Sequence, residues 1–115
     1  MDSVTPSADQ PVLEVRNLST WFDTGREVIK AVDDVSFTLR RGKTLCVVGE
    51  SGSGKSITAR SILNIVPRPG RIVQGSILLH QTSEAATGPV DIAKLDPKGR
   101  RVRAIRGRDI AMIFQ

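Results

Sequence analysis

The sequence predicts an α/β fold in which one strand–loop–helix unit lies beside a layer of antiparallel strands. Three observations favour this class. A short apolar run at residues 44–48 leads into a loop rich in glycine and serine, and a helical repeat of apolar residues follows that loop. Most of the other predicted strands have no helix between them, which is typical of an antiparallel layer. Apolar residues make up 39% of the 115 residues, enough for the modest core of one small domain.

The first part of the chain is predicted to hold a tail and a strand. Residues 1–11 are rich in Ser, Asp, Thr and Pro, so we expect a disordered tail before a domain at residues 12–115. Residues 12–15 alternate between apolar and acidic side chains, and this alternation predicts an edge strand.

The remaining strands and turns follow from apolar runs and from the breaks between them. Further strands are predicted at residues 28–39, 44–48, 72–79 and 110–114. Turns are predicted at residues 23–26, 41–42 and 68–71. The segments between them are a polar surface loop at 81–90, a short strand or helical turn at 91–95, and a helix or irregular segment at 98–106. The strand at 28–39 carries an irregularity at Asp33 and Asp34.

Residues 49–56 read GESGSGKS and fit the pattern G-x-x-x-x-G-K-[ST] of a phosphate-binding P-loop. In such a loop the backbone N–H groups surround phosphates, the lysine reaches the β- and γ-phosphates, and the hydroxyl ligates Mg²⁺. The N-terminus of the following helix adds unpaired N–H groups and partial positive charge. The sequence therefore predicts part of a P-loop NTPase core with an antiparallel β-subdomain and a single α-helix after the loop.

The motif defines a set of candidate phosphate-binding residues. They are Gly49, Ser51, Gly52, Ser53, Gly54, Lys55, Ser56 and Ile57. The helix that follows has apolar residues at Ile57, Ala59, Ile62, Leu63 and Ile65. Pro67 and Pro69 end it.

The net charge of +5 is concentrated near the end of the chain. Six cations lie within twelve residues there, against the single acid Asp109: Lys98, Arg100, Arg101, Arg103, Arg106 and Arg108. Such a cluster can bind nucleic acid, but no aromatic residues alternate with the cations to stack on bases. We therefore expect a solvated basic segment in preference to a nucleic-acid site.

The remaining chemically distinctive residues have ordinary structural interpretations. Cys46 lies inside the apolar run at residues 44–48 and is predicted to be a buried thiol. A single cysteine allows no disulfide within the chain, which fits a reducing compartment. His80 is predicted to be a surface histidine at the end of a strand. No apolar run is long enough to span a membrane, so membrane association is expected to come through a partner.

Four stretches of the chain resemble the first part of an ABC transporter ATPase subunit. More narrowly, the chain resembles the oligopeptide and dipeptide (and nickel) importer branch of this family. The stretches are residues 13–18, 31–37, 44–56 and 105–115, the last of which reads IRGRDIAMIFQ and is the most specific to the branch. The resemblance covers nearly all of the chain after residue 12.

This resemblance implies roles for particular residues. Lys55 would bind the β- and γ-phosphates of ATP, and Ser56 would ligate Mg²⁺. Gln115 matches the Q-loop glutamine, which contacts the metal and the attacking water and senses the membrane subunit. An aromatic residue before the second strand would stack on adenine. Phe22 is favoured over Trp21 for this role, although the family usually has tyrosine there.

The resemblance also implies partners and a location. An ATPase of this family pairs with a second ATPase subunit, as a homodimer or heterodimer, and with transmembrane permease subunits. A solute-binding protein takes part indirectly, and no nucleic acid is expected. The implied location is the cytoplasmic face of the bacterial inner membrane, as a peripheral subunit.

Three later motifs of the family are not found before the chain ends at Gln115. These are the LSGGQ-type signature, the strand ending in Asp-Glu and the switch histidine. We therefore expect the complete protein to hydrolyse ATP and this chain at most to bind nucleotide. We also expect it to be marginally stable, since the strands at 44–48 and 110–114 would lack neighbours.

Two alternatives remain open from the sequence. One is a truncated product without catalytic activity. The other is a different P-loop NTPase, such as a small kinase or GTPase, although no N-K-x-D-like guanine motif is found.

Overall fold

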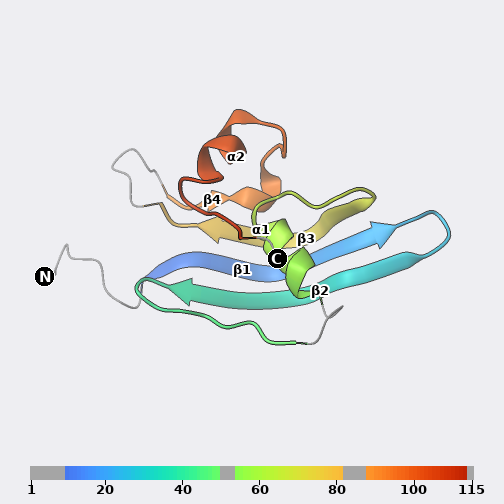
Figure 1. Ribbon diagram of the computed structural model, residues 1–115, viewed down its shortest axis with the longest axis horizontal. Coiled ribbons are helices and arrows are strands. Elements are labelled where there is room, and N and C mark those ends of the chain that lie inside the picture. The colour runs from blue at the N-terminus through green and yellow to red at the C-terminus, as the bar shows by residue number, and fades with distance from the viewer. Residues whose placement is uncertain (1–9, 50–53, 82–87, 114–115) are drawn as a thin grey trace, which may run out of the picture.

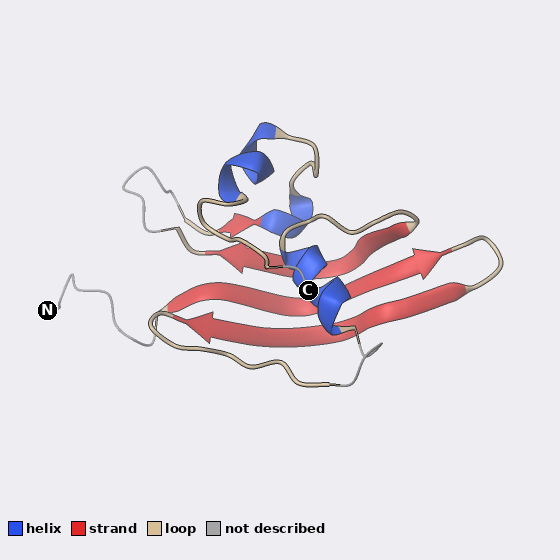
Figure 2. Ribbon diagram, viewed as in Figure 1, coloured by secondary structure: helices blue, strands red, loops and turns tan. Residues whose placement is uncertain are grey.

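The structure is a computed structural model that describes residues 10–49, 54–81 and 88–113 (Figure 1). A four-stranded antiparallel sheet has the spatial order β2–β1–β3–β4. Its strands are β1 (Pro11–Asp23), β2 (Val28–Arg40), β3 (Gly70–Leu79) and β4 (Val90–Asp91). The helical elements are α1 (Lys55–Ile62), the 3₁₀ turn η1 (Ile92–Lys94) and α2 (Arg100–Ile105). Figure 2 shows α1 crossing the sheet and α2 lying beside the β4 edge.

These elements confirm the predicted α/β class with its antiparallel β layer. The helix after the loop begins as predicted but ends at Ile62, before Leu63, Ile65 and Pro67. It ends there because Asn64 adopts a left-handed conformation. The strands predicted at 28–39 and 72–79 match β2 and β3 to within two residues. The segments predicted at 91–95 and 98–106 contain η1 and α2.

The β1–β2 hairpin turns at the predicted position. Gly25 has a φ of 86°, and its N–H donates to Asp23 Oδ1 at 2.9 Å. The Thr24 N–H donates to the Glu27 carbonyl at 3.0 Å and closes the turn. A short polar side chain that accepts from the backbone two residues on favours such a turn, which is why Asp and Gly occur together here.

A bulge interrupts the hairpin at the predicted irregularity. Asp34 has a φ of 56°, and the β1–β2 register shifts on either side of Leu18. The Asp34 N–H, displaced from the strand ladder, donates to Ser19 Oγ at 2.9 Å, and Asp34 Oδ1 accepts from Asn17 Nδ2 at 2.8 Å. Side chains thus replace the backbone pairing lost at the bulge.

The core lies between the sheet and the helical elements. It is aliphatic, as the low aromatic content of the sequence predicts. Its buried members are Leu13, Val15, Leu18, Val32, Ile77, Leu79, Val90, Ile92, Val102 and Ile105. Helix α2 and η1 contribute to this core, so they are packed parts of the same unit.

The prediction of an edge strand at residues 12–15 is wrong. Strand β1 is central, because β2 pairs with one side of it and β3 with the other. Val15 faces Phe37 on β2 and Ile77 on β3. The acidic Glu14 suggested an edge, but its carboxylate is instead bound by Arg16 and His80.

Two other predicted strands do not form. Residues 43–49 have no regular secondary structure, and residues 111–113 also lie outside any strand. Ile110 makes only an isolated bridge with Arg106. An apolar, β-branched run becomes a strand only where another strand pairs with it, and among the described residues no strand pairs with either of these two runs.

One consequence is that Cys46 is exposed, which corrects the prediction of a buried thiol. Val48 is 89% exposed in the same segment. His80 follows β3 as predicted, but it is half-buried and not a surface histidine, because its ring packs beside Glu14 with Nε2 2.9 Å from Glu14 Oε1. The predicted disordered tail and the loop at 81–90 fall mainly on residues 1–9 and 82–87, outside the described residues.

Candidate phosphate-binding site

The N-terminus of α1 is formed by a glycine that no other residue could replace without strain. Gly54 precedes the helix in the left-handed conformation, with φ 96° and ψ 3°. A Cβ atom at this position would lie 2.4 Å from the carbonyl oxygen of Ala31 on β2. Gly54 therefore permits both the turn into the helix and a close approach of the helix to the sheet.

This helix end is suited to bind an anion. No side chain caps it, and its first turn contains no acidic residue. The first intrahelical bond is donated by the Thr58 N–H to the Gly54 carbonyl at 2.9 Å. The N–H groups of residues 55–57 therefore have no partner within the helix, and they carry the partial positive charge of its N-terminus.

Lys55 and Ser56 are the first two residues of α1. Lys55 Nζ donates to the carbonyl oxygen of Gly49 and so joins the two ends of the motif. Ser56 is exposed. Ile57 is half-buried and packs against the core, which orients the first turn. Among the described residues, the structure thus brings together the Lys55 ammonium, the hydroxyls of Ser56 and Thr58, and backbone donors without an intrahelical partner at one end of α1.

Several candidate residues lie outside the described residues. They are Ser51, Gly52, Ser53 and Gln115. Their roles stay predictions, as do the ligand contacts of Lys55 and Ser56.

Phe22, the candidate adenine-stacking residue, is half-buried near the end of β1. Its ring is packed closely against Gly70 at the start of β3, where a Cβ atom would come within 2.6 Å of the ring. The neighbouring Trp21 ring is covered by Lys30, whose Nζ lies 4.7 Å from the ring centroid. Both aromatic residues therefore have packing partners of their own, and stacking of Phe22 on a base stays a prediction.

A buried hydrogen bond fixes the last turn of α1 to the sheet. Ser61 Oγ donates to the Ile57 carbonyl at 2.7 Å and lies 2.7 Å from Thr20 Oγ1 on β1. Since the single hydroxyl proton of Ser61 goes to Ile57, Thr20 is the donor of the second bond. Thr20 and Ser61 are both fully buried, so the Thr20 hydroxyl depends on Ser61 as its acceptor, whereas Ser61 also has the Ile57 carbonyl.

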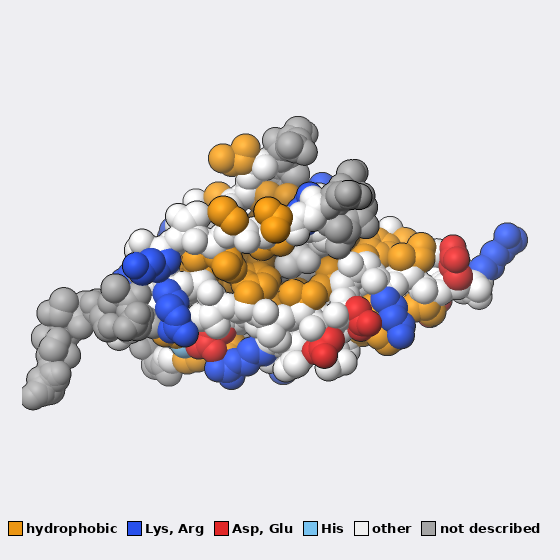
Figure 3. All heavy atoms as spheres, turned by 90° about the horizontal axis from the view of Figure 1, so that it is seen from below, with side chains coloured by type: hydrophobic (Ala, Val, Ile, Leu, Met, Phe, Trp, Pro, Cys, Tyr) orange, Lys and Arg blue, Asp and Glu red, His pale blue; other side chains and the backbone are white. Residues whose placement is uncertain are grey.

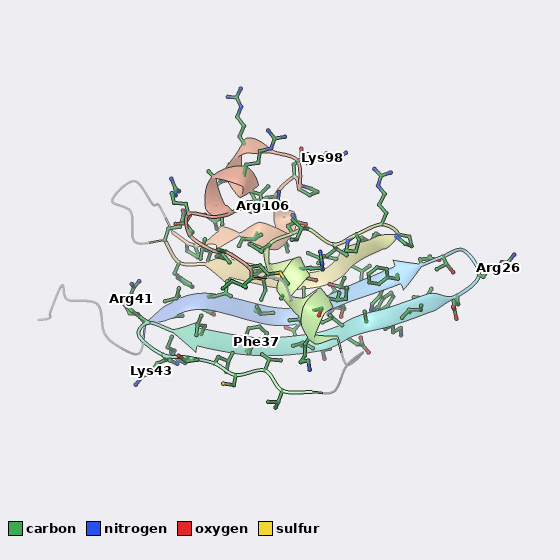
Figure 4. The ribbon with its side chains drawn as sticks, viewed as in Figure 1. Arg26, Phe37, Arg41, Lys43, Lys98 and Arg106 are labelled. Carbon is green, nitrogen blue, oxygen red and sulfur yellow. The ribbon has the colours of Figure 1, made fainter. Side chains whose placement is uncertain are left out.

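The C-terminus of α1 is held by side chains from two directions. Asn64, with a φ of 57°, donates from Nδ2 to the carbonyls of Ile92 at 3.2 Å and Leu95 at 2.9 Å. Arg106, at the end of α2, donates from Nε to the Leu63 carbonyl and from Nη2 to the Asn64 carbonyl, both at 2.9 Å. Figure 4 shows Arg106 between α2 and α1.

The expectation of a solvated basic segment is therefore wrong for one of its six cations. Arg106 is half-buried, whereas the other five are exposed: Lys98, Arg100, Arg101, Arg103 and Arg108. Sequence reasoning missed Arg106 because its partners are more than 40 residues away along the chain. Its position directly after an amphipathic helical segment was the only local signal.

A cavity of about 410 Å³ lies beneath α1. It is bounded by the sheet, by the segment at 43–47 and by the inner side of α1. Its lining is mainly apolar: Leu13, Phe37, Leu39, Leu45, Val47, Ala59 and Ile62, with Lys43, Thr44, Lys55 and Thr58. Such a lining suits apolar groups better than phosphates, although Lys55 from the N-terminus of α1 lies at its border.

The described residues offer a metal ion few ligands. They contain no group of three or more His, Cys, Asp or Glu side chains placed to hold one. The Ser56 hydroxyl is the described side chain that the motif assigns to Mg²⁺. Within the same described ranges, no helix is long and apolar enough to cross a membrane.

Comparison with known proteins gives one family match and several similar sequences. A family model described as "ABC transporter" matches residues 32–115. A putative peptide import ATP-binding protein of Brucella ovis is 44% identical over 107 residues, which are 92% of this chain and 30% of that protein. A dipeptide transport ATP-binding protein of Lactococcus lactis subsp. cremoris is 39% identical over 108 residues, 94% of this chain and 28% of that protein.

A third relative is the glutathione import ATP-binding protein of Pectobacterium atrosepticum. It is 39% identical over 122 aligned residues, which cover 100% of this chain and 18% of that protein. The chain thus spans between 18% and 30% of the length of these three relatives.

Proposed function

The chain belongs to the ABC transporter family, and we propose on this premise that it binds ATP at the N-terminus of α1. The observation that carries the proposal is the set of N–H groups without an intrahelical partner there, with Lys55 beside them and no acid in the first turn. Since the family model matches residues 32–115, a small kinase or GTPase is no longer a competing interpretation.

The described residues fit the phosphates of a nucleotide. A Cβ at residue 54 would clash with β2, so only glycine keeps α1 at its present depth against the sheet. The N–H groups of residues 55–57 would bind phosphate oxygens, and the Lys55 ammonium would leave Gly49 to bind the β- and γ-phosphates. The first turn of α1 contains no acidic residue, so no side chain there would repel the negative charge of the phosphates.

We propose that Ser56 and Gln115 hold Mg²⁺ together with the nucleotide. Ser56 is exposed at the helix end, so its hydroxyl can reach an ion at the phosphates without rearrangement of the core. A bound Mg²⁺ would neutralise phosphate charge. Gln115 would contact the ion and the attacking water in the complete protein.

At the scale of the complete protein, we propose an ATPase subunit of an importer for dipeptides or oligopeptides. The support is that relatives named for peptide and dipeptide import are 44% and 39% identical over most of this chain. The proposed partners are a second ATPase subunit and transmembrane permease subunits, with a solute-binding protein acting indirectly. The proposed location is the cytoplasmic face of the bacterial inner membrane.

The test of nucleotide binding is a Lys55→Ala variant. Loss of a charge-assisted hydrogen bond to phosphate costs about 1.5–3 kcal/mol, so we expect ATP to bind about 10- to 100-fold more weakly in the presence of Mg²⁺. Isothermal titration of the purified chain measures this. Lys98→Ala removes the same charge from an exposed position outside the site and serves as the control. Equal ATP affinity of K55A and the unchanged chain would overturn the proposal.

A further inference from the structure

Arg106 binds the end of α1 that lies opposite the proposed phosphate site. Its guanidinium donates to two successive carbonyls, those of Leu63 and Asn64, at 2.9 Å each. Leu63 is the C-cap of α1 and Asn64 is the residue after it. The carbonyls of residues 59–61 already accept backbone N–H groups, and Arg106 supplies donors to the next carbonyls at this negatively polarised end. A guanidinium with two parallel donors therefore satisfies both hydrogen-bonding groups and charge at this terminus.

The contact is shielded from solvent. Leu63 is only 7% exposed, and Arg106 itself is half-buried. On the same helix end, Asn64 donates to two carbonyls in and after η1. The C-terminus of α1 is thus bound by both helical elements that follow β3 in the chain.

Arg106 also lies at the start of a tight turn. The Gly107 N–H donates to the Ile110 carbonyl at 2.7 Å, and the Ile110 N–H donates to the Ile105 carbonyl at 3.2 Å. Residues 111–113 follow this turn in the sequence, and Gln115, with its proposed metal contact, comes two positions later. The guanidinium therefore connects the segment that leads to Gln115 with the helix that carries Lys55.

Because α1 is short, a contact at its C-terminus can affect the position of its N-terminus. The helix has eight residues, so its two ends are only about 12 Å apart. Thr20 and Gly54 already fix its distance from the sheet. The contacts at Leu63 and Asn64 fix its C-terminus, and a short helix transmits a displacement at one end to the other.

We propose that Arg106 is a positioning residue for the phosphate-binding end of α1. It does not touch the nucleotide. It holds α1 at the depth and rotation at which the donors at residues 55–57 and Lys55 converge, and it links that placement to the segment before Gln115. The inference rests on the proposed ATP site, and its test separates the two.

The variants are Arg106→Gln, Arg106→Lys and the control Arg103→Gln. Arg103 is an exposed cation three residues earlier on α2, so its loss changes the net charge equally. We expect R106Q to weaken ATP binding by roughly 2- to 30-fold, the range of coupling through contiguous contacts. R106K keeps the charge but cannot donate along two fixed directions, so we expect it to restore part of the affinity. R103Q should bind as the unchanged chain does.

A variant that is destabilised at another position distinguishes a positioning role of Arg106 from a general contribution to stability. Leu79→Val removes a methylene group from a buried side chain near the end of β3, an element other than α1 and α2. If Arg106 acts only on stability, then L79V and R106Q with similar thermal midpoints will bind ATP equally. That result, or unchanged ATP affinity in R106Q, would overturn the inference.

Hydrogen exchange gives a readout that does not require nucleotide. The Thr58 amide is bonded to the Gly54 carbonyl at the phosphate end of α1, away from Arg106. We expect its exchange to be faster in R106Q by the same roughly 2- to 30-fold, and unchanged in R103Q. If the unchanged chain fails to bind ATP, the proposed function is overturned, while this exchange still decides the inference. Equal Thr58 exchange in R106Q and R103Q contradicts it.

Discussion

At the scale of single residues, Gly54 is the position where backbone conformation and site geometry coincide. We expect Gly54→Ala to lower the free energy of unfolding by about 2–4 kcal/mol, because its positive φ is strained for alanine and its Cβ would overlap the Ala31 carbonyl. Urea denaturation followed by circular dichroism measures this.

Gly42 is a matched control for Gly54. It has a φ of 73°, but a Cβ there would meet nothing within 4 Å. We expect Gly42→Ala to cost only the conformational strain, about 1 kcal/mol. Equal losses in the two variants would show that the close approach to Ala31 is not what requires glycine at residue 54.

Glu14 makes stability depend on pH in the acidic range. Its hydrogen bond with Arg16 and a second one with His80 lower the pKa of Glu14 below the ordinary value of 4.5, and burial opposes this in part. A carboxyl with a lowered folded-state pKa stabilises the fold above its unfolded pKa. That stabilisation is lost as the pH falls through the folded pKa.

We therefore expect the unchanged chain to lose more stability than Glu14→Gln between pH 5 and about pH 3. Urea midpoints at several pH values measure the difference. The effect should be small, because Arg16 is largely exposed and solvent screens the pair. Parallel pH profiles for the two chains would exclude a contribution from Glu14.

The candidate site was predictable from the sequence where one motif contains it. Lys55 and Ser56 begin a helix as the P-loop pattern predicts. The start of this helix is a local feature, because it depends on the backbone conformation of the adjacent Gly54. Arg106 was not predictable in the same way. Its partners at Leu63 and Asn64 are brought to it only by tertiary packing, and nothing in the composition of the basic segment distinguishes it from Arg103.

At the scale of elements, the contact between α1 and β1 depends on one buried hydroxyl pair. We expect Ser61→Ala to cost about 1–3 kcal/mol of unfolding free energy, since the Thr20 hydroxyl is then buried without its acceptor. Thermal and urea denaturation measure this. The double variant with Thr20→Val should cost less than the sum of the two single changes. Additive losses would contradict the pairing.

An element was predicted correctly when residues within the segment itself determine its conformation, and wrongly when distant partners determine it. The hairpin turn at Asp23 and Gly25 and the bulge at Asp34 are local, and they were predicted correctly. The run at 44–48 has the composition of a strand, but strand formation requires partners outside the segment. The same limitation made β1 look like an edge strand, because its pairing with β3 is formed by residues far along the chain.

At the scale of the whole molecule, one face carries exposed apolar side chains. Figure 3 views the molecule from the side of the 43–49 segment and shows hydrophobic side chains gathered across the middle of that face. Leu45 and Val47 are 43% and 54% exposed, beside Val48 at 89%. Apolar surface of this kind promotes association.

We expect Val48→Lys to reduce self-association of the chain without lowering its stability, because the side chain is already in solvent. Sedimentation velocity at increasing protein concentration measures the effect. Thr38→Lys, at an exposed position within β2, is a control for added charge. A chain that remains monomeric at high concentration before any substitution would contradict the expectation.

Because β1 is central, its two partner strands become available to it at different times while the chain is being synthesised at the ribosome. Its partner β2 follows after a turn of four residues, but its partner β3 is completed roughly 40 residues later. At about 5–20 residues per second, one side of β1 therefore remains unpaired for about 2–8 s after the hairpin has emerged. During this interval the growing chain exposes the unpaired backbone N–H and C=O groups along one edge of β1, so we expect nascent-chain chaperones to matter most between these two points of translation.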